Sequence, residues 1–192
     1  NISALNGILT TVTNDGGHLF KFVEDYVEII YSSQNYNISS GRTIADRNDS
    51  TSYATVSGTA LRVYKVVTYD MNDVAMTVLP NAPIDDATGL PIPTIAVATA
   101  GGPSVIRDDG IVVDVIHTAF KNITQIFFTE DNLLAYLAAG TVNQSYGFHY
   151  VKIPSGDLDN GTDGRNVGTH DVRFYNGDGR NYIPSLGSRA YA

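Results

Sequence analysis

The sequence predicts an all-β protein, and composition, turn chemistry and an internal repeat lead to that prediction. Charged residues make up only 17% of the 192-residue chain, whereas Thr, Val, Ile and Tyr are plentiful, which favours strands over helices. Asn-Gly and Asp-Gly turn sequences recur, and these pairs accept the positive φ of tight hairpins. They lie at residues 14–17, 108–110, 159–161 and 176–179.

The repeat becomes apparent when the sequence is aligned with itself at an offset of 86 positions, because two segments then match without a gap. The aligned pairs are Leu9 with Ile95, Thr13 with Thr99, Gly16 with Gly102, residues 19–21 with 105–107, and residues 27–30 with 113–116. Half of this offset is about 43, and weaker copies lie near that spacing at residues 53–67 and 134–140. The pattern therefore predicts a repeated unit of short strands.

A unit of about 43 residues with three or four strands has the size of one β-propeller blade. The chain would hold about four such blades, a number at the lower limit for a closed ring. The predicted blades are approximately residues 1–45, 46–90, 91–122 and 123–192, within a single repeat domain. We expect either a four-bladed ring or an arc of a larger propeller, and a β-sandwich is the alternative fold.

Individual elements follow from local patterns. Residues 123–130 and 146–153 are expected to be strands, and the helix-like stretch 131–139 is interpreted as a turn followed by a strand. The nearly continuous apolar segments 95–99 and 111–116 predict buried central strands. Residues 79–93 contain four of the seven prolines and predict an extended connection.

Composition excludes several classes of protein. The absence of cysteine rules out a disulfide scaffold and a cysteine-ligated metal site. With 12 Lys and Arg against 20 Asp and Glu, a nucleic-acid partner is not expected. The apolar runs fall short of the roughly 18 residues of a membrane helix, so no membrane span is expected. The chain opens on Asn1 rather than Met, and we expect it to be part of a longer chain.

Residues 80–116, PNAPIDDATGLPIPTIAVATAGGPSVIRDDGIVVDVI, resemble a segment of large marine phage-encoded proteins. These proteins are described as tail-associated or as carrying concanavalin-like lectin modules. Residues 170–190, HDVRFYNGDGRNYIPSLGSRA, resemble the continuation, and the similarity extends from about Val74 to the end. The resemblance implies a structural or host-facing part of a virion and carries no catalytic residue.

The segment D-L-D-N-G-T-D-G suggests a calcium site at Asp157, Asp159 and Asp163, because Ca²⁺ takes six to eight oxygen ligands. The twelfth position counted from Asp157 is Gly168 rather than the Glu of an EF-type loop. A solvated acidic turn is therefore the favoured interpretation, and no other cofactor is expected.

No catalytic residue is predicted. The histidines show no metal-binding spacing and are expected to be structural or on the surface; they are His18, His117, His149 and His170. The adjacent carboxylates Asp85-Asp86 and Asp108-Asp109 lie in turns and point apart, unlike a glycosidase pair.

Four tyrosines near Asn- and Asp-rich turns are candidates for stacking on sugars: Tyr146, Tyr150, Tyr175 and Tyr182. The alternative is cross-strand packing, for which Tyr146, Phe148 and Tyr150 alternate on one face. Six Asn-x-Ser/Thr sequons would accept glycans in a protein secreted by a eukaryote and are otherwise polar turns. They begin at Asn1, Asn37, Asn48, Asn122, Asn143 and Asn160.

The sequence thus predicts a non-enzymatic structural or interaction module of a phage-like virion or tail assembly, located on the virion or outside the cell. Its expected partners are other virion or tail subunits, further domains of the same chain and surface glycans. The alternative is a secreted carbohydrate-binding domain of lectin type, and a third reading is a glycoside-cleaving propeller.

Overall fold

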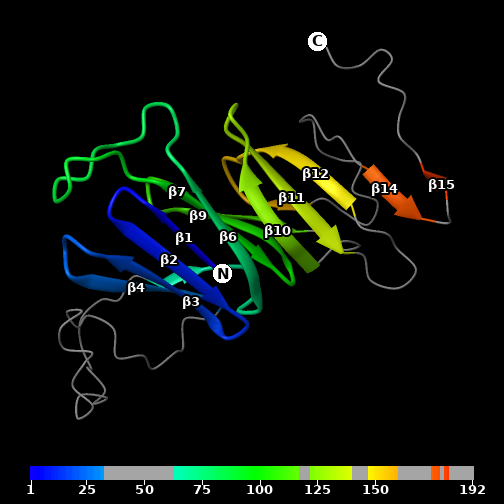
Figure 1. Cartoon of the computed structure of the whole chain (residues 1–192), viewed down its shortest axis with the longest axis horizontal. Coiled ribbons are helices and arrows are strands. Elements are labelled where there is room, and N and C mark those ends of the chain that lie inside the picture. The colour runs from blue at the N-terminus through cyan, green and yellow to red at the C-terminus, as the bar shows by residue number, and fades with distance from the viewer. Residues whose placement is uncertain (33–62, 117–121, 140–146, 160–173, 178–179, 182–192) are drawn as a thin grey trace.

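The fold is all-β, as the sequence predicts. The computed structural model describes residues 1–32, 63–116, 122–139, 147–159, 174–177 and 180–181. These residues form fifteen strands and no helix, arranged as three five-stranded sheets (Figure 1). Within this part of the chain, nothing has the length and apolar character of a membrane-crossing helix.

Sheets 1 and 2 share one topology, in which four antiparallel strands follow each other and a fifth strand is added in parallel. Sheet 1 consists of β1 (Ile2–Leu5), β2 (Ile8–Thr13), β3 (Gly16–Lys21), β4 (Tyr26–Tyr31) and β5 (Val63–Lys65). Sheet 2 consists of β6 (Met71–Thr77), β7 (Thr94–Thr99), β8 (Gly102–Ile106), β9 (Val112–Ile116) and β13 (Leu158–Asp159).

Sheet 3 is antiparallel throughout. It consists of β10 (Asn122–Phe128), β11 (Leu133–Ala139), β12 (Gly147–Lys152), β14 (Phe174–Gly177) and β15 (Arg180–Asn181). The helix-like stretch 131–139 is indeed a turn followed by strand β11, with Asn132 at a φ of 59° in the turn. Asn accepts such a φ more readily than most residues, which explains why the turn forms there.

The 86-residue repeat is present in the structure. Strand β2 spans residues 8–13 and β7 spans 94–99, and β3 and β8 also begin 86 residues apart. Thr13 and Thr99 end the first strand of each pair, and each hydroxyl donates to the carbonyl three residues on, that of Gly16 (3.0 Å) or Gly102 (2.6 Å). Each hydroxyl also accepts the backbone N–H two residues on. The repeated sequence therefore encodes one and the same turn twice.

The three sheets pack face to face, with sheet 2 in the middle (Figure 1). Strand β7 is buried along its whole length. Ile95 and Val97 belong to the core between sheets 1 and 2, whereas Ala96 and Ala98 belong to the core between sheets 2 and 3. The expectation of a buried central strand at residues 95–99 is therefore confirmed.

The same expectation is wrong at the ends of the segment 111–116. Ile111 is 53% exposed and Ile116 is 40% exposed, although Val113 and Val115 are buried. The physical reason is position, because Ile111 precedes β9 in the β8–β9 turn and Ile116 is the last residue of β9, on the face opposite Val113 and Val115.

Each sheet packs on the sheet before it in the same way. Strand β6 contacts β1 and β2 of sheet 1, and β10 contacts β6 and β7 of sheet 2. The first strand of each sheet thus lies over the first two strands of the sheet before it. The sheets formed by the described residues do not close into a ring or barrel, so the number of blades stays a prediction.

Only the three middle strands of sheets 1 and 2 follow the 86-residue offset, because β2, β3 and β4 correspond to β7, β8 and β9. Residues 63–65 of the weaker copy 53–67 form β5 and join sheet 1, while residues 53–62 lie outside the described part of the chain. Sheet 1 therefore takes strands from both sides of the expected boundary at 45/46, and the division into 43-residue units stays a prediction.

The proline-rich segment forms an extended connection between β6 and β7, as expected. Its two arms approach each other through a bridge between Ile84 and Pro91. The Asn6 side-chain amide, in the β1–β2 turn, donates to the Pro91 carbonyl over 2.8 Å. This contact anchors the connection of sheet 2 on sheet 1.

Replacing Gly102 by Ala should destabilise the protein strongly. Gly102 has a φ of 139°, and a Cβ there would collide with the carbonyl oxygen of Val115. We expect Gly102→Ala to lower the free energy of unfolding by at least about 3 kcal/mol, from backbone strain and overpacking together. Urea denaturation followed by circular dichroism measures the change.

Two matched variants control this prediction. Gly156→Ala should change stability by less than about 1 kcal/mol, because nothing lies within 4 Å of the added Cβ. Gly16→Ala should fall between the two, since its Cβ would meet the Tyr31 ring at 3.0 Å. Equal losses for the three variants would contradict the turn geometry described above.

Candidate functional site: a pocket between sheets 1 and 2

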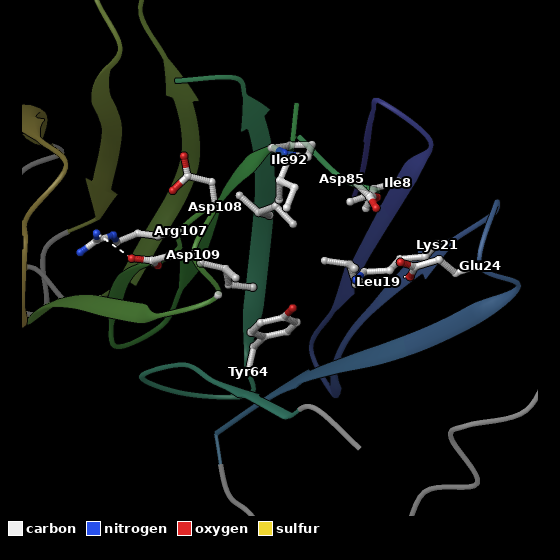
Figure 2. Close-up of a pocket in the computed structure, with 14 residues that line it drawn as sticks. Ile8, Leu19, Lys21, Glu24, Tyr64, Asp85, Ile92, Arg107, Asp108 and Asp109 are labelled. Atoms are coloured by element: carbon white, nitrogen blue, oxygen red, sulfur yellow. Dashed lines mark ion pairs between the residues drawn. The ribbon is translucent and has the colours of Figure 1, made fainter. Parts of the chain in front are cut away.

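A pocket of about 280 Å³ lies where the core between sheets 1 and 2 opens to solvent (Figure 2). Strands β2 and β3 form one wall, and β7 and β8 with the β8–β9 turn form the other. The β6–β7 connection contributes a further wall. The inner surface is apolar and comprises Ile8, Leu19, Tyr64, Ile92, Pro93, Ile95 and Ile106.

Charged side chains surround this apolar surface. Two bases and four carboxylates line the pocket: Lys21, Arg107, Glu24, Asp85, Asp108 and Asp109. Lys21 and Arg107 are equivalent under the 86-residue offset and stand on opposite walls (Figure 2). With more carboxylates than bases, the lining disfavours an anionic ligand.

Ion pairs hold part of this charged lining. Lys21 Nζ lies 3.4 Å from Glu24 Oε2, and Arg107 Nη2 lies 2.8 Å from Asp109 Oδ2. Arg107 Nη1 also donates to the Ser155 carbonyl over 3.2 Å. These side chains are partly exposed, so each pair adds about 1 kcal/mol or less to stability. Their main effect is to position the charges.

Tyr64 places a hydroxyl at the inner end of the pocket (Figure 2). The hydroxyl donates to Oε2 of buried Glu28 over 2.7 Å, and Lys21 Nζ lies 3.7 Å from Glu28 Oε1. A hydrogen bond to a carboxylate is stronger than one between neutral groups, so the ring is held in one orientation. The pocket therefore combines a fixed aromatic ring with carboxylates that can accept hydrogen bonds.

The pocket contains residues that sequence reasoning did not single out. Asp85, Asp108 and Asp109 were expected only as solvated turn residues, yet all three line the pocket. Tyr64 was not a candidate at all. The only signal was its place in the weak repeat copy 53–67, because nothing local distinguishes it from a packing residue.

The described residues include only two of the three predicted calcium ligands. Asp157 Oδ1 accepts the backbone N–H of Asp114 over 3.0 Å and so joins the start of β13 to β9. The backbone of Asp159 lies in β13, and Asp163 lies outside the described residues. Among the described residues, no group of three or more His, Asp or Glu is placed to hold a metal ion. The calcium site stays a prediction.

The predicted sugar-stacking tyrosines do not reach the pocket where their side chains are described. Tyr150 lies on β12 in sheet 3, and its ring meets Phe148 edge-on at a centroid distance of 5.6 Å. Tyr175 lies in β14, where its backbone pairs with Gly147. Tyr146 and Tyr182 lie outside the described residues.

Two histidines and two sequons are described. His18 is exposed on β3, and His149 is fully buried and stacks on Tyr136 at 4.9 Å. Asn122 Oδ1 accepts from Asn72 Nδ2 over 2.8 Å, and Asn1 Nδ2 donates to the Asn72 carbonyl. The remaining histidines and sequons lie outside the described residues: His117, His170, Asn37, Asn48, Asn143 and Asn160.

In comparisons with protein-family models, curated proteins and solved structures, the chain matches none of them. The similarity to marine phage tail-associated proteins therefore stays a prediction from the sequence.

Asp114 should make the stability of the protein depend on pH. Burial raises the pKa of the Asp114 carboxyl above its ordinary value; the hydrogen bond from Ser104 Oγ (2.6 Å) opposes the rise, and the charge of Asp157 adds to it. The folded state then holds the proton to higher pH than the unfolded state does. Stability from this group is highest below the ordinary Asp value and falls as the pH rises through the raised value.

Urea titrations from about pH 3 to about pH 7 test this effect. Asp114→Asn keeps an acceptor for Ser104 and removes the titration, so it should gain stability relative to the wild type as the pH rises. Ser104→Ala removes the opposing hydrogen bond and should make the fall steeper. A constant difference between the wild type and Asp114→Asn at every pH would contradict the raised pKa.

Proposed function

We propose that the chain is a non-enzymatic structural and interaction module of a phage-like virion or tail assembly, exposed on the outside. The observation that supports this proposal best is the burial of sheet 2 on both faces. Two continuous apolar cores join three sheets into one stack, and interiors packed in this way resist deformation. Such a stack suits a spacer or an assembly surface.

We further propose that the stack is an arc of a propeller. In a propeller, blades pack face to face around an axis and their first strands lie near that axis. The contacts of β1 with β6 and of β6 with β10 are of this kind. A two-sheet sandwich has one core, whereas the described residues of this chain form two.

Exposure on a particle is tested by immunogold electron microscopy. Antibodies raised against the purified chain are expected to label intact particles from the source of the sequence, with pre-immune serum as the control. Labelling that appears only after the particles are disrupted would place the chain inside and overturn the proposal. The absence of the chain from purified particles by mass spectrometry would overturn it as well.

Carbohydrate binding is a second candidate, and the pocket between sheets 1 and 2 favours it. Its volume of about 280 Å³ lies just below the roughly 300–1,000 Å³ of typical small-molecule sites. An apolar wall with Tyr64 suits the C–H face of a sugar ring, and the surrounding carboxylates suit its hydroxyls. A neutral monosaccharide unit meets both requirements.

A glycan array followed by calorimetry tests this candidate. The wild type should bind at least one neutral glycan, and Asp108→Asn should weaken that binding by about tenfold, because one charged acceptor is lost. Asp131→Asn, in the exposed β10–β11 turn, is the matched control and should bind like the wild type. Equal affinities of all three proteins would contradict glycan binding in this pocket.

A further inference from the structure

Two carboxylates in the pocket between sheets 1 and 2 form no ion pair. The Asp108 carboxylate, in the β8–β9 turn, makes no hydrogen bond or ion pair within the part of the chain that the structure describes. The Asp85 carboxylate, in the β6–β7 connection, accepts the backbone N–H of Ala87 over 2.9 Å and has no ion pair among the described residues. Both side chains line the pocket and are half-buried. We call these two groups, for their lack of an ion pair, the unpaired carboxylates.

The two bases of the pocket are held by other carboxylates. Lys21 Nζ lies 3.4 Å from Glu24 Oε2 and 3.7 Å from Oε1 of buried Glu28. Arg107 Nη2 lies 2.8 Å from Asp109 Oδ2. Each positive charge of the pocket thus already has a negative partner. The negative charge of the unpaired carboxylates is therefore left uncompensated by the described residues of the pocket.

A ligand that enters the pocket displaces water from the unpaired carboxylates. Removing water from a charged group costs free energy unless another group compensates the charge. The hydroxyls of a neutral sugar supply hydrogen bonds but no charge, whereas an ammonium group supplies both. Hydrogen bonds between oppositely charged groups are also shorter and stronger than those between neutral groups. A ligand with a protonated amine therefore suits the unpaired carboxylates better than a neutral one.

The unpaired carboxylates border the apolar surface of the pocket (Figure 2). Ile92 and Pro93 belong to the same connection as Asp85, and Ile106 comes directly before the turn that carries Asp108. A compact ligand therefore meets an apolar surface and a carboxylate at the same time. A sugar ring can place its C–H face on the apolar surface while an amine at the edge of the ring points to a carboxylate.

We propose that the pocket binds an amino sugar, a sugar unit with a protonated amine, in preference to a neutral sugar. This inference rests on carbohydrate binding by the same pocket, the second candidate function above. A neutral unit satisfies the apolar surface and the hydrogen-bond acceptors, and the amine adds the positive charge that the unpaired carboxylates lack. The net charge of −8 on the whole chain also attracts a cationic ligand from solution.

Calorimetry with three matched trisaccharides is the first test. The probes are the β-1,4-linked trimers of glucosamine, of N-acetylglucosamine and of glucose, which share the ring and the linkage and differ only in the group at C2. At about pH 6 the glucosamine amines are protonated. The wild type is expected to bind the glucosamine trimer at least about tenfold more tightly than the glucose trimer, because only the former supplies a charge-assisted hydrogen bond.

Charge-removing variants locate the preference in the pocket. Asp108→Asn and Asp85→Asn should each lower the affinity for the glucosamine trimer about tenfold more than they lower the affinity for the glucose trimer. Asp86→Asn is the matched control, because it removes the same charge from the same connection at an exposed residue that does not line the pocket. This control should keep the preference of the wild type. A preference that all three variants keep overturns the proposal.

Two measurements on the wild type keep the test decisive if a variant fails to fold. Raising the NaCl concentration from about 0.01 M to about 1 M shortens the Debye length from about 30 Å to about 3 Å. The preference for the glucosamine trimer should shrink over this range, while the affinity for the glucose trimer should change little. Trilysine, which carries amines without a sugar ring, should bind more weakly than the glucosamine trimer.

The outcomes separate this inference from carbohydrate binding itself. If the wild type binds the glucose or the N-acetylglucosamine trimer as tightly as the glucosamine trimer, the preference for an amine is overturned and carbohydrate binding stands. If trilysine binds as tightly as the glucosamine trimer, the amino sugar is overturned, because the acidic surface then takes any polyamine. If none of the three trisaccharides binds, carbohydrate binding by the pocket is overturned together with this inference.

Discussion

Burial of both faces of sheet 2 is the constraint on which the rest of the structure depends. Strand β7 carries no exposed residue, with larger side chains toward sheet 1 (Ile95, Val97) and alanines toward sheet 3 (Ala96, Ala98). This asymmetry lets β10 approach closely on one side, while the other side leaves room for the pocket at the edge of the core. Removing either neighbouring sheet would expose a largely apolar surface to water, at about 25 cal/mol per Å².

Much of the fold could be predicted from the sequence because it is encoded locally. The two Thr hydroxyls that close equivalent turns, at Thr13 and Thr99, are part of a repeat that can be read directly from residue spacing. The strand at 133–139 follows from the strand patterns on both sides of it and from the turn before it. Such features depend on residues that are close in the sequence, so the pattern of residue types predicts them.

The pocket and the parallel edge strands could not be predicted because they depend on distant residues. Tyr64 meets Glu28 across 36 positions, and β13 reaches β9 from more than 40 residues away. No local signal marks such pairs, since a Tyr on a strand packs in the same way with or without a ligand. Asp85, Asp108 and Asp109 belong to ordinary acidic turns, and only the stacking of two sheets brings them to one pocket.

Native-state hydrogen exchange followed residue by residue by NMR tests the central claim most directly. If sheet 2 is clamped between two cores, the amides of β7 should exchange only through global unfolding and should be the slowest in the protein. The amides at the exposed ends of β9 should exchange faster, through local opening. Fast exchange along β7, at the rate of those ends, would contradict the three-sheet stack.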